Sequence, residues 1–378
     1  MIKFIRLIGS LVLAWSVLPA CVEPYDPPLD DADISHLVVN GSLNVSEGTA
    51  TIALSRTQPV KQTEKSPVET GAFVYIEDDM GILHPLAEPI PGYYTGAVSV
   101  NDTERRYRLV IKTRNNREYV SDFIVIVETP PIDSISYTIT NDGVEFEVNT
   151  HDPTNLTRHY RWKYVETYEY HSAFRSNHMF TPTEIVQRPP DQAIDICWKT
   201  NASTGILVGS NQHLKESVTS RAPVAFVPKG SIKLTVKYSL LVQQQAVTAE
   251  EYNYWLNLQK STEKLGGLFD PLPSEVRGNI HCTNAPGEKV LGYFGGGTVR
   301  ELRRTIRRQE LPGEIVRYSG NYCVMDTLLL ADIPNVSRAT LLIDEIVDFA
   351  LIGYTSSVGS CIDCRILGGT TQMPAFWE

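Results

Sequence analysis

Apolar and polar residues alternate along most of the chain from residue 37 onward, which predicts a mainly β protein. Segments in which every second residue is apolar are typical of half-buried strands, and here they follow one another with turns between them. Those before residue 128 are LVVNGSLN (37–44), TATIALSRT (49–57), GAFVYIEDD (71–79), GYYTGAV (92–98), YRLVIKT (107–113) and REYVSDFIVI (117–126). Because six or seven short strands without a helix fill about 90 residues, we expect an immunoglobulin-like β-sandwich at residues 36–128.

Pro130-Pro131 forms a stiff linker, after which the pattern predicts a second β-rich domain at residues 132–378 with one prominent helix. Its expected strands are 135–140, 144–150, 159–172, 205–210, 222–228 and 231–247, and residues 173–195 are expected to form a long loop. The helix is expected at about 249–265, with Thr248 as its N-cap and Gly266-Gly267 as its end. A lone helix among strands covers a sheet edge or offers a docking surface.

The long strand at 159–172 carries an aromatic face. Its aromatic residues alternate, and they are Tyr160, Trp162, Tyr164, Tyr168 and Tyr170. At a period of two, such a face packs in a core or serves as a platform on which a glycan stacks, and both interpretations stay open.

The first twenty residues have the pattern of a bacterial lipoprotein signal peptide. Lys3 and Arg6 precede an apolar run at 7–18, which is too short to span a bilayer and ends in Leu18-Pro19-Ala20-Cys21. We expect cleavage after residue 20 and lipid attachment at Cys21, so that acyl chains anchor the protein to a membrane without a span. The alternative is an ordinary secretory signal with an incidental cysteine.

Residues 21–35 are acidic and proline-rich, which predicts an extended tether between the lipid and the folded domains. The acids are Glu23, Asp26, Asp30, Asp31 and Asp33. The same acids also fit a signal for export to the cell surface, and the two interpretations are compatible.

Charge excludes one class of partner. The chain has 378 residues and a formal net charge of −10, and clustered basic residues are what nucleic-acid binding requires, so no nucleic acid is expected. One local basic cluster consists of Arg300, Arg303, Arg304, Arg307 and Arg308. A solvated strand or turn face explains it; the alternative is a contact with an anionic partner or lipopolysaccharide.

Motifs for catalysis are missing from the sequence. The eight histidines do not follow a metal-ligand spacing, and Gly295-Gly296-Gly297 is not followed by the GK[ST] of a phosphate loop. The sequence also has no G-x-S-x-G motif. We therefore expect no catalytic, cofactor-binding or metal residues, no cofactor and no enzyme activity.

Five cysteines remain after Cys21, and an exported protein can form disulfides from them. They are Cys197, Cys282, Cys323, Cys361 and Cys364. Five allow at most two bridges. The CxxC pair 361–364 is expected to be structural, with a zinc site completed by His281 and Cys282 or a thioredoxin-like redox pair as the alternatives.

Several segments together resemble one family, the lipoproteins of Bacteroidota called domain of unknown function 4249. They are Cys21 in its lipobox, LVVNGSLN (37–44), HYRWKYVETYEYHS (159–172), CWKT (197–200), ILVGS (206–210), the segment 237–282, PGEKVLGYFGGGTV (286–299) and CIDCRILGGTTQMPAFW (361–377). The resemblance implies a surface-exposed outer-membrane lipoprotein whose gene commonly lies beside one for a TonB-dependent receptor. It implies no catalytic residues.

We therefore expect an accessory or substrate-capturing subunit of a TonB-dependent transporter, with a glycan or peptide as a possible ligand. Its anchor would raise its effective concentration beside the receptor. The alternative is an adhesin or structural surface protein without a transporter. A surface hydrolase is a third class, which a pocket with convergent carboxylates and perturbed pKa values would support.

Overall fold

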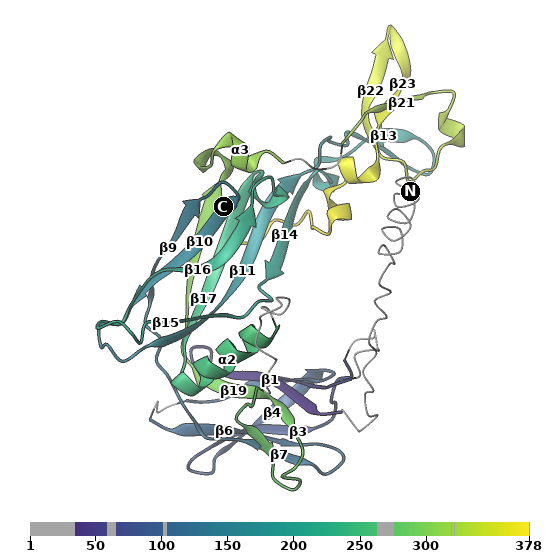
Figure 1. Ribbon diagram of the computed structural model, residues 1–378. Coiled ribbons are helices and arrows are strands. Elements are labelled where there is room, and N and C mark those ends of the chain that lie inside the picture. The colour runs from purple at the N-terminus through teal and green to yellow at the C-terminus, as the bar shows by residue number, and fades with distance from the viewer. Residues whose placement is uncertain are drawn as a thin grey trace, which may run out of the picture.

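The computed structural model describes residues 35–58, 66–100, 104–262, 276–318, 320 and 322–377, and it confirms the mainly β prediction (Figure 1). The expected signal peptide, Cys21 and nearly all of the tether lie outside the described residues. The described chain forms three β units: a ten-stranded sheet, a two-sheet sandwich and a small five-stranded sheet.

The first unit is a ten-stranded sheet folded over a single apolar core. Its order is β18-β7-β6-β3-β4-β5-β2-β1-β19, with β8 paired to β6. The strands are β1 (Leu37–Asn44), β2 (Thr49–Arg56), β3 (Phe73–Asp78), β4 (Leu83–Ile90), β5 (Tyr93–Ala97), β6 (Arg106–Lys112), β7 (Glu118–Ser121), β8 (Ile124–Val125), β18 (Ile280–Cys282) and β19 (Val290–Gly297). Alternate residues point inward, as in β2, where Ala50, Ile52 and Leu54 are buried.

Two strands of this first unit come from far along the chain. β19 pairs in parallel with β1, from Leu37 beside Val290 to Asn44 beside Gly297, and β18 pairs with β7. The predicted boundary at 36–128 therefore misses residues 280–297, because a local hydrophobic pattern does not show which distant strand pairs with it. The predicted second domain at residues 132–378 is therefore not one continuous unit, because its residues 280–297 belong to the first sheet.

The second unit is a sandwich that shares one core between two sheets. One sheet has the order β16-β10-β9, and the other has β14-β11-β17-β20 with β15 paired to β11. The strands are β9 (Ile132–Ile139), β10 (Gly143–His151), β11 (His159–His171), β14 (Ile196–Ala202), β15 (Leu207–Ser210), β16 (Val218–Pro228), β17 (Lys237–Ala246) and β20 (Val299–Arg307).

The aromatic face of β11 lies in this core. Tyr160, Trp162, Tyr168 and Tyr170 are each at most 5 % exposed, and Tyr164 is half-buried and packs against the same cluster. The ligand-platform interpretation is therefore wrong for this face. The opposite sheet covers it, and a ring without accessible surface cannot stack on a ligand.

The third unit is a small sheet of order β13-β12-β22-β23-β21, which Figure 1 shows at one extremity of the molecule. Its strands are β12 (His178–Phe180), β13 (Ile185–Gln187), β21 (Asp326–Leu329), β22 (Leu342–Asp348) and β23 (Ala350–Ser356). The expected loop at 173–195 thus contains two short strands. At the tip of the β22–β23 hairpin, Phe349 is fully exposed and has a left-handed backbone with φ of 55°.

Helices are few among the described residues. The longest is α2 (Ala249–Thr262), which confirms the predicted helix up to residue 262; the rest of its predicted range lies outside the described residues. The others are η1 (Pro190–Gln192), η2 (Ile232–Leu234), η3 (Arg308–Glu310), α3 (Gly313–Val316), η4 (Ile333–Asn335), η5 (Gly359–Cys361) and η6 (Cys364–Leu367).

Two disulfides use the CxxC pair, but they do not join its two cysteines to each other. Cys364 bonds to Cys197 in β14, and Cys361 bonds to Cys323 just before β21. The pair therefore joins the sandwich to the small unit, and its sulfurs are not available to a metal or as a redox couple. Cys282 is a free thiol buried in the first core.

Candidate functional site

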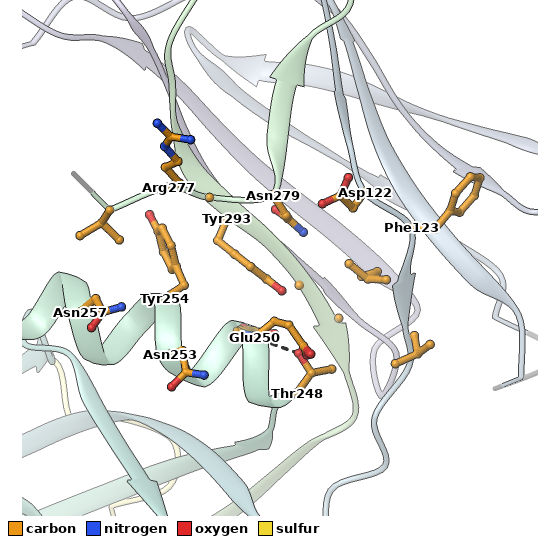
Figure 2. Close-up of a pocket in the computed structure, with 17 residues that line it drawn as sticks. Asp122, Phe123, Thr248, Glu250, Asn253, Tyr254, Asn257, Arg277, Asn279 and Tyr293 are labelled. Atoms are coloured by element: carbon orange, nitrogen blue, oxygen red, sulfur yellow. Dashed lines mark hydrogen bonds between the residues drawn. The ribbon is translucent and has the colours of Figure 1, made fainter. Parts of the chain in front are cut away.

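A cavity of about 540 Å³ opens between helix α2 and the first unit (Figure 2). This volume lies within the range typical of small-molecule sites, ~300–1,000 Å³. Its walls come from the segment around β8, helix α2, the residues before β18, and β19. The lining side chains that the argument uses are Asp122, Glu250, Glu251, Asn253, Tyr254, Asn257, Arg277 and Tyr293.

Helix α2 presents two different faces at this place. Thr248 begins it, because its Oγ1 accepts a hydrogen bond from the Glu251 backbone N–H at 3.2 Å. Tyr254 and Trp255 pack inward, and the Tyr254 ring lies 5.1 Å from that of Tyr293 on β19. Asn253 and Asn257, four residues apart on the same face, are exposed toward the cavity.

Glu251 is the most deeply buried carboxyl group of the cavity wall, with 5 % of its surface exposed. The Trp255 Nε1–H donates to Glu251 Oε1 at 3.1 Å. The carboxyl lies against Gly295, where a Cβ would collide with it. Gly295 in β19 therefore serves the close packing of helix α2 against this strand.

Positive charge lies behind this carboxyl. The Arg161 guanidinium stacks on the Trp255 ring at 3.6 Å. Burial raises the pKa of Glu251, while the Trp255 hydrogen bond and the charges of Arg161 and Lys163 oppose that shift. Burial, followed by the negative charge of Glu251, also raises the pKa of Tyr293 to about 12. Both groups therefore favour their neutral forms.

Five further polar side chains of the wall have no hydrogen-bond partner among the described residues. They are Asp122, Glu250, Asn253, Asn257 and Arg277, and all five are exposed. Figure 2 shows Asp122 on the far side of the cavity from the two asparagines of helix α2. Unpaired donors and acceptors that converge on one space are what a polar ligand requires.

The raised pKa of Glu251 leads to a prediction about pH. The Glu251 carboxyl binds its proton more tightly in the folded protein than in the unfolded chain. The free energy of unfolding therefore includes a contribution from this proton that is complete below the ordinary pKa of 4.5 and is lost as pH rises through the pKa of the folded state. Glu251→Gln removes this loss. We expect thermal denaturation to show the variant gaining stability relative to wild type as pH rises from 4.5 to 8. Glu250→Gln, exposed on the same turn, is the control, and parallel pH curves for Glu251→Gln and wild type would contradict the prediction.

Two other cavities are less suited to a ligand because their charged groups are already paired. In one, of about 730 Å³, Arg56 contacts Glu69 at 2.6 Å and Arg117 contacts Glu288 at 3.2 Å. In the other, of about 700 Å³, the Asp152 carboxylate accepts backbone hydrogen bonds from Thr154, Leu156 and Thr157. Despite burial, hydrogen bonds from Thr154 and Thr157 lower the pKa of Asp152 to about 2.

The arginine cluster of the sequence mostly serves packing. The Arg303 guanidinium stacks on Phe376 at 3.7 Å, and Arg304 lies over Tyr137 at 5.6 Å. The Arg300 Nε–H donates to the Thr129 carbonyl at 3.2 Å, next to the Pro130-Pro131 linker. These contacts, with the C-terminal tail, strand β9 and the residue before the linker, explain three of the five arginines without an anionic partner.

None of the site residues that the sequence predicted lines the cavity. The residues of helix α2 had one signal, because Asn253 and Asn257 follow a helical spacing on a polar face. No local sequence signal marked Asp122 as a site residue. It lies opposite helix α2 only because β7 pairs with β18 and β19 joins the same sheet.

The described residues hold neither a cluster of metal ligands nor a membrane-spanning helix. Within the described ranges, His, Cys, Asp and Glu side chains do not gather in threes as metal ligands. No helix there is long and apolar enough to cross a membrane.

Comparison with known proteins gives one informative match. A family model described as "Domain of unknown function (DUF4249)" matches residues 22–303, well over half of the chain. No curated protein matches. One solved structure with some similarity is described as "Complete structure of manganese lipoxygenase of Gaeumannomyces graminis and partial structure of zonadhesin of Komagataella pastoris". The match has 10 % identity and covers 57 % of this chain and 90 % of that chain. With a TM-score of 0.15, this match supports no conclusion about fold or function.

Proposed function

Since the chain belongs to the DUF4249 family, we propose that it is a lipid-anchored protein of the outer-membrane surface that captures a polar ligand for a TonB-dependent transporter. The signal-peptide pattern ending in Cys21 supports the anchor, and the acidic tether supports export to the cell surface in a member of the Bacteroidota. The ligand-capturing part of the proposal rests on the cavity at helix α2.

One observation carries this proposal. Five exposed polar side chains, which have no partner among the described residues, line a cavity of about 540 Å³ beside two tyrosine rings. A protein with only a structural role has no need of such a cavity, because unpaired polar groups contribute little to folding and can be replaced at no cost. A capturing protein needs them to orient its ligand.

A second feature supports contact with a receptor. The β22–β23 hairpin projects from the molecule (Figure 1) and exposes Val347 and Phe349 at its end. The left-handed backbone of Phe349 costs of order 1–3 kcal/mol, and such strain is concentrated at functional sites. We propose this tip as the part that contacts the receptor.

The proposal is tested by co-purification from the native host. Outer membranes containing the tagged full-length protein are extracted in mild detergent, and the proteins that accompany it are identified. We expect a TonB-dependent receptor in stoichiometric amount, with loss of the receptor in Cys21→Ser, which cannot be lipidated. We expect Phe349→Ser to weaken the association while the protein stays at the membrane.

Met80→Ser is the matched control, because Met80 is also a highly exposed apolar side chain but lies in a turn of the first unit. A receptor retained equally by wild type and Phe349→Ser would refute the hairpin contact. A partner-free wild-type protein would refute the transporter role and leave an adhesin or structural surface protein.

A surface hydrolase is a second candidate, favoured by one specific observation. Glu251, whose pKa burial raises, lies in the same cavity wall as Asp122 and Glu250, and pairs of carboxyls with different pKa values carry out acid–base hydrolysis of glycosides. Prolonged incubation with any oligosaccharide that binds, followed by chromatography, separates the two roles. Cleavage that Glu251→Gln abolishes supports the hydrolase, and an unchanged oligosaccharide supports capture alone.

A further inference from the structure

The unassigned property of the α2 cavity is the chemical class of its ligand, and this inference rests on the function proposed above. Its free side chains are of three kinds. Asp122 and Glu250 offer carboxylate acceptors, Asn253 and Asn257 offer amide donors and acceptors, and Arg277 offers guanidinium donors. A ligand that satisfies all five must both donate and accept hydrogen bonds.

Other ligand classes meet this wall less well. An anionic ligand would face two exposed carboxylates, Asp122 and Glu250, against the single guanidinium of Arg277, so repulsion outweighs attraction at this wall. An apolar ligand would bury these polar groups without partners, which is costly. A small cation would satisfy the carboxylates and the amide oxygens but would leave the amide N–H donors and the Arg277 guanidinium without partners.

An extended peptide meets an obstacle at the strand edge. Peptides commonly bind by adding a strand to an open sheet edge. Here the Asn279 side chain occupies the edge of β19, because its Nδ2–H donates to the Phe294 carbonyl at 2.8 Å and its Oδ1 accepts from the Phe294 N–H at 2.9 Å. A peptide cannot add to β19 at this point without displacing Asn279.

We infer that the α2 cavity binds a neutral carbohydrate of oligosaccharide size. Sugar hydroxyls donate and accept hydrogen bonds, so they match both the carboxylates and the amides of this wall. The half-buried ring of Tyr293, held against buried Tyr254 at 5.1 Å, adds aromatic surface for the apolar face of a sugar ring. The buried carboxyl of Glu251, held by Trp255, closes the inner end of the wall.

The test uses the full-length lipoprotein in mild detergent on an array of neutral and acidic glycans and on a library of short peptides. We expect binding to neutral oligosaccharides, and titration calorimetry with the best of them should show affinity about tenfold weaker or worse for Asn253→Ala/Asn257→Ala. Both asparagines are exposed and lack partners, so this variant should fold normally. Lys260→Ala, exposed on the same helix but outside the cavity wall, should bind as wild type does.

Each other outcome overturns the inference. Binding of peptides or amines but not glycans refutes the ligand class, as does binding of nothing on either array. Glycan binding that the double variant leaves unchanged refutes the site. Receptor co-purification is a separate measurement, so a glycan-binding protein without a receptor refutes only the transporter role, and a receptor-bound protein without glycan binding refutes only the carbohydrate inference.

Discussion

Replacing Cys197 and Cys364 together by serine is expected to lower the free energy of unfolding by about 4 kcal/mol. This disulfide closes a loop between residues 167 positions apart, and long loops lose the most chain entropy when cross-linked in the unfolded state. It also fixes the C-terminal tail against the sandwich. There the Tyr170 hydroxyl donates to the Cys364 carbonyl at 2.8 Å, and Trp198 and Thr370 exchange backbone hydrogen bonds.

Denaturant unfolding with and without a reducing agent measures this effect. Reduction should destabilise the wild type at least as much as the double substitution does, because it also opens the shorter Cys323–Cys361 loop. Cys282→Ser is the control and should change stability by about 1 kcal/mol or less, since the free thiol bonds only to Asn284 and a hydroxyl can keep that partner. Equal stability of the double variant and the wild type would contradict the prediction.

Trp162→Ala is expected to cost about 4 kcal/mol of stability, because it empties a large volume in the sandwich core. The ring stacks on Tyr160 with centroids 5.7 Å apart, and it fits because residue 209 on β15 is glycine, where a Cβ would lie 2.7 Å from the ring. Its Nε1–H donates to Gln244 Oε1 at 2.9 Å. Gln244 in turn donates to the Pro130 carbonyl at 3.0 Å, which links the core to the linker between the units.

Trp162→Phe separates the hydrogen bond from the packing and should cost about 1–2 kcal/mol. Denaturant unfolding measures both variants. The affinity of Trp162→Phe for any ligand of the α2 cavity should equal that of the wild type, because the ring is buried away from that cavity. A strong loss of ligand affinity without a loss of stability would instead restore the aromatic face as a binding platform.

Local patterns in the sequence predicted much of the local structure. The strands at 37–44, 49–57 and 107–113 and the helix capped by Thr248 were all predictable, because each depends on a period of two or on a capping residue within its own segment. The strand at 83–90 was not predicted, because it contains Pro85 and Pro89 and prolines are disfavoured in strands. The structure nevertheless accommodates both prolines within β4.

The candidate site was not predictable in the same way. Glu250 and Glu251 belong to no recognisable motif in the sequence, and the glycine triplet was considered only as a phosphate loop and rejected. Their roles depend on β19 crossing beneath helix α2, which places Gly295 against the Glu251 carboxyl. The same limit applied to the CxxC pair, whose partners lie 167 and 38 residues away.

The sequence by itself determined that this chain is mainly β, where helix α2 begins, and which family it belongs to, because each of these is encoded in residues close together or in a pattern along the chain. Only the tertiary structure decided that residues 280–297 complete the first unit, that the aromatic face of β11 is core, and that a polar cavity forms at helix α2. The physical reason is that burial and convergence depend on which distant strands pair, and the hydrophobic period that specifies a strand does not specify its neighbour.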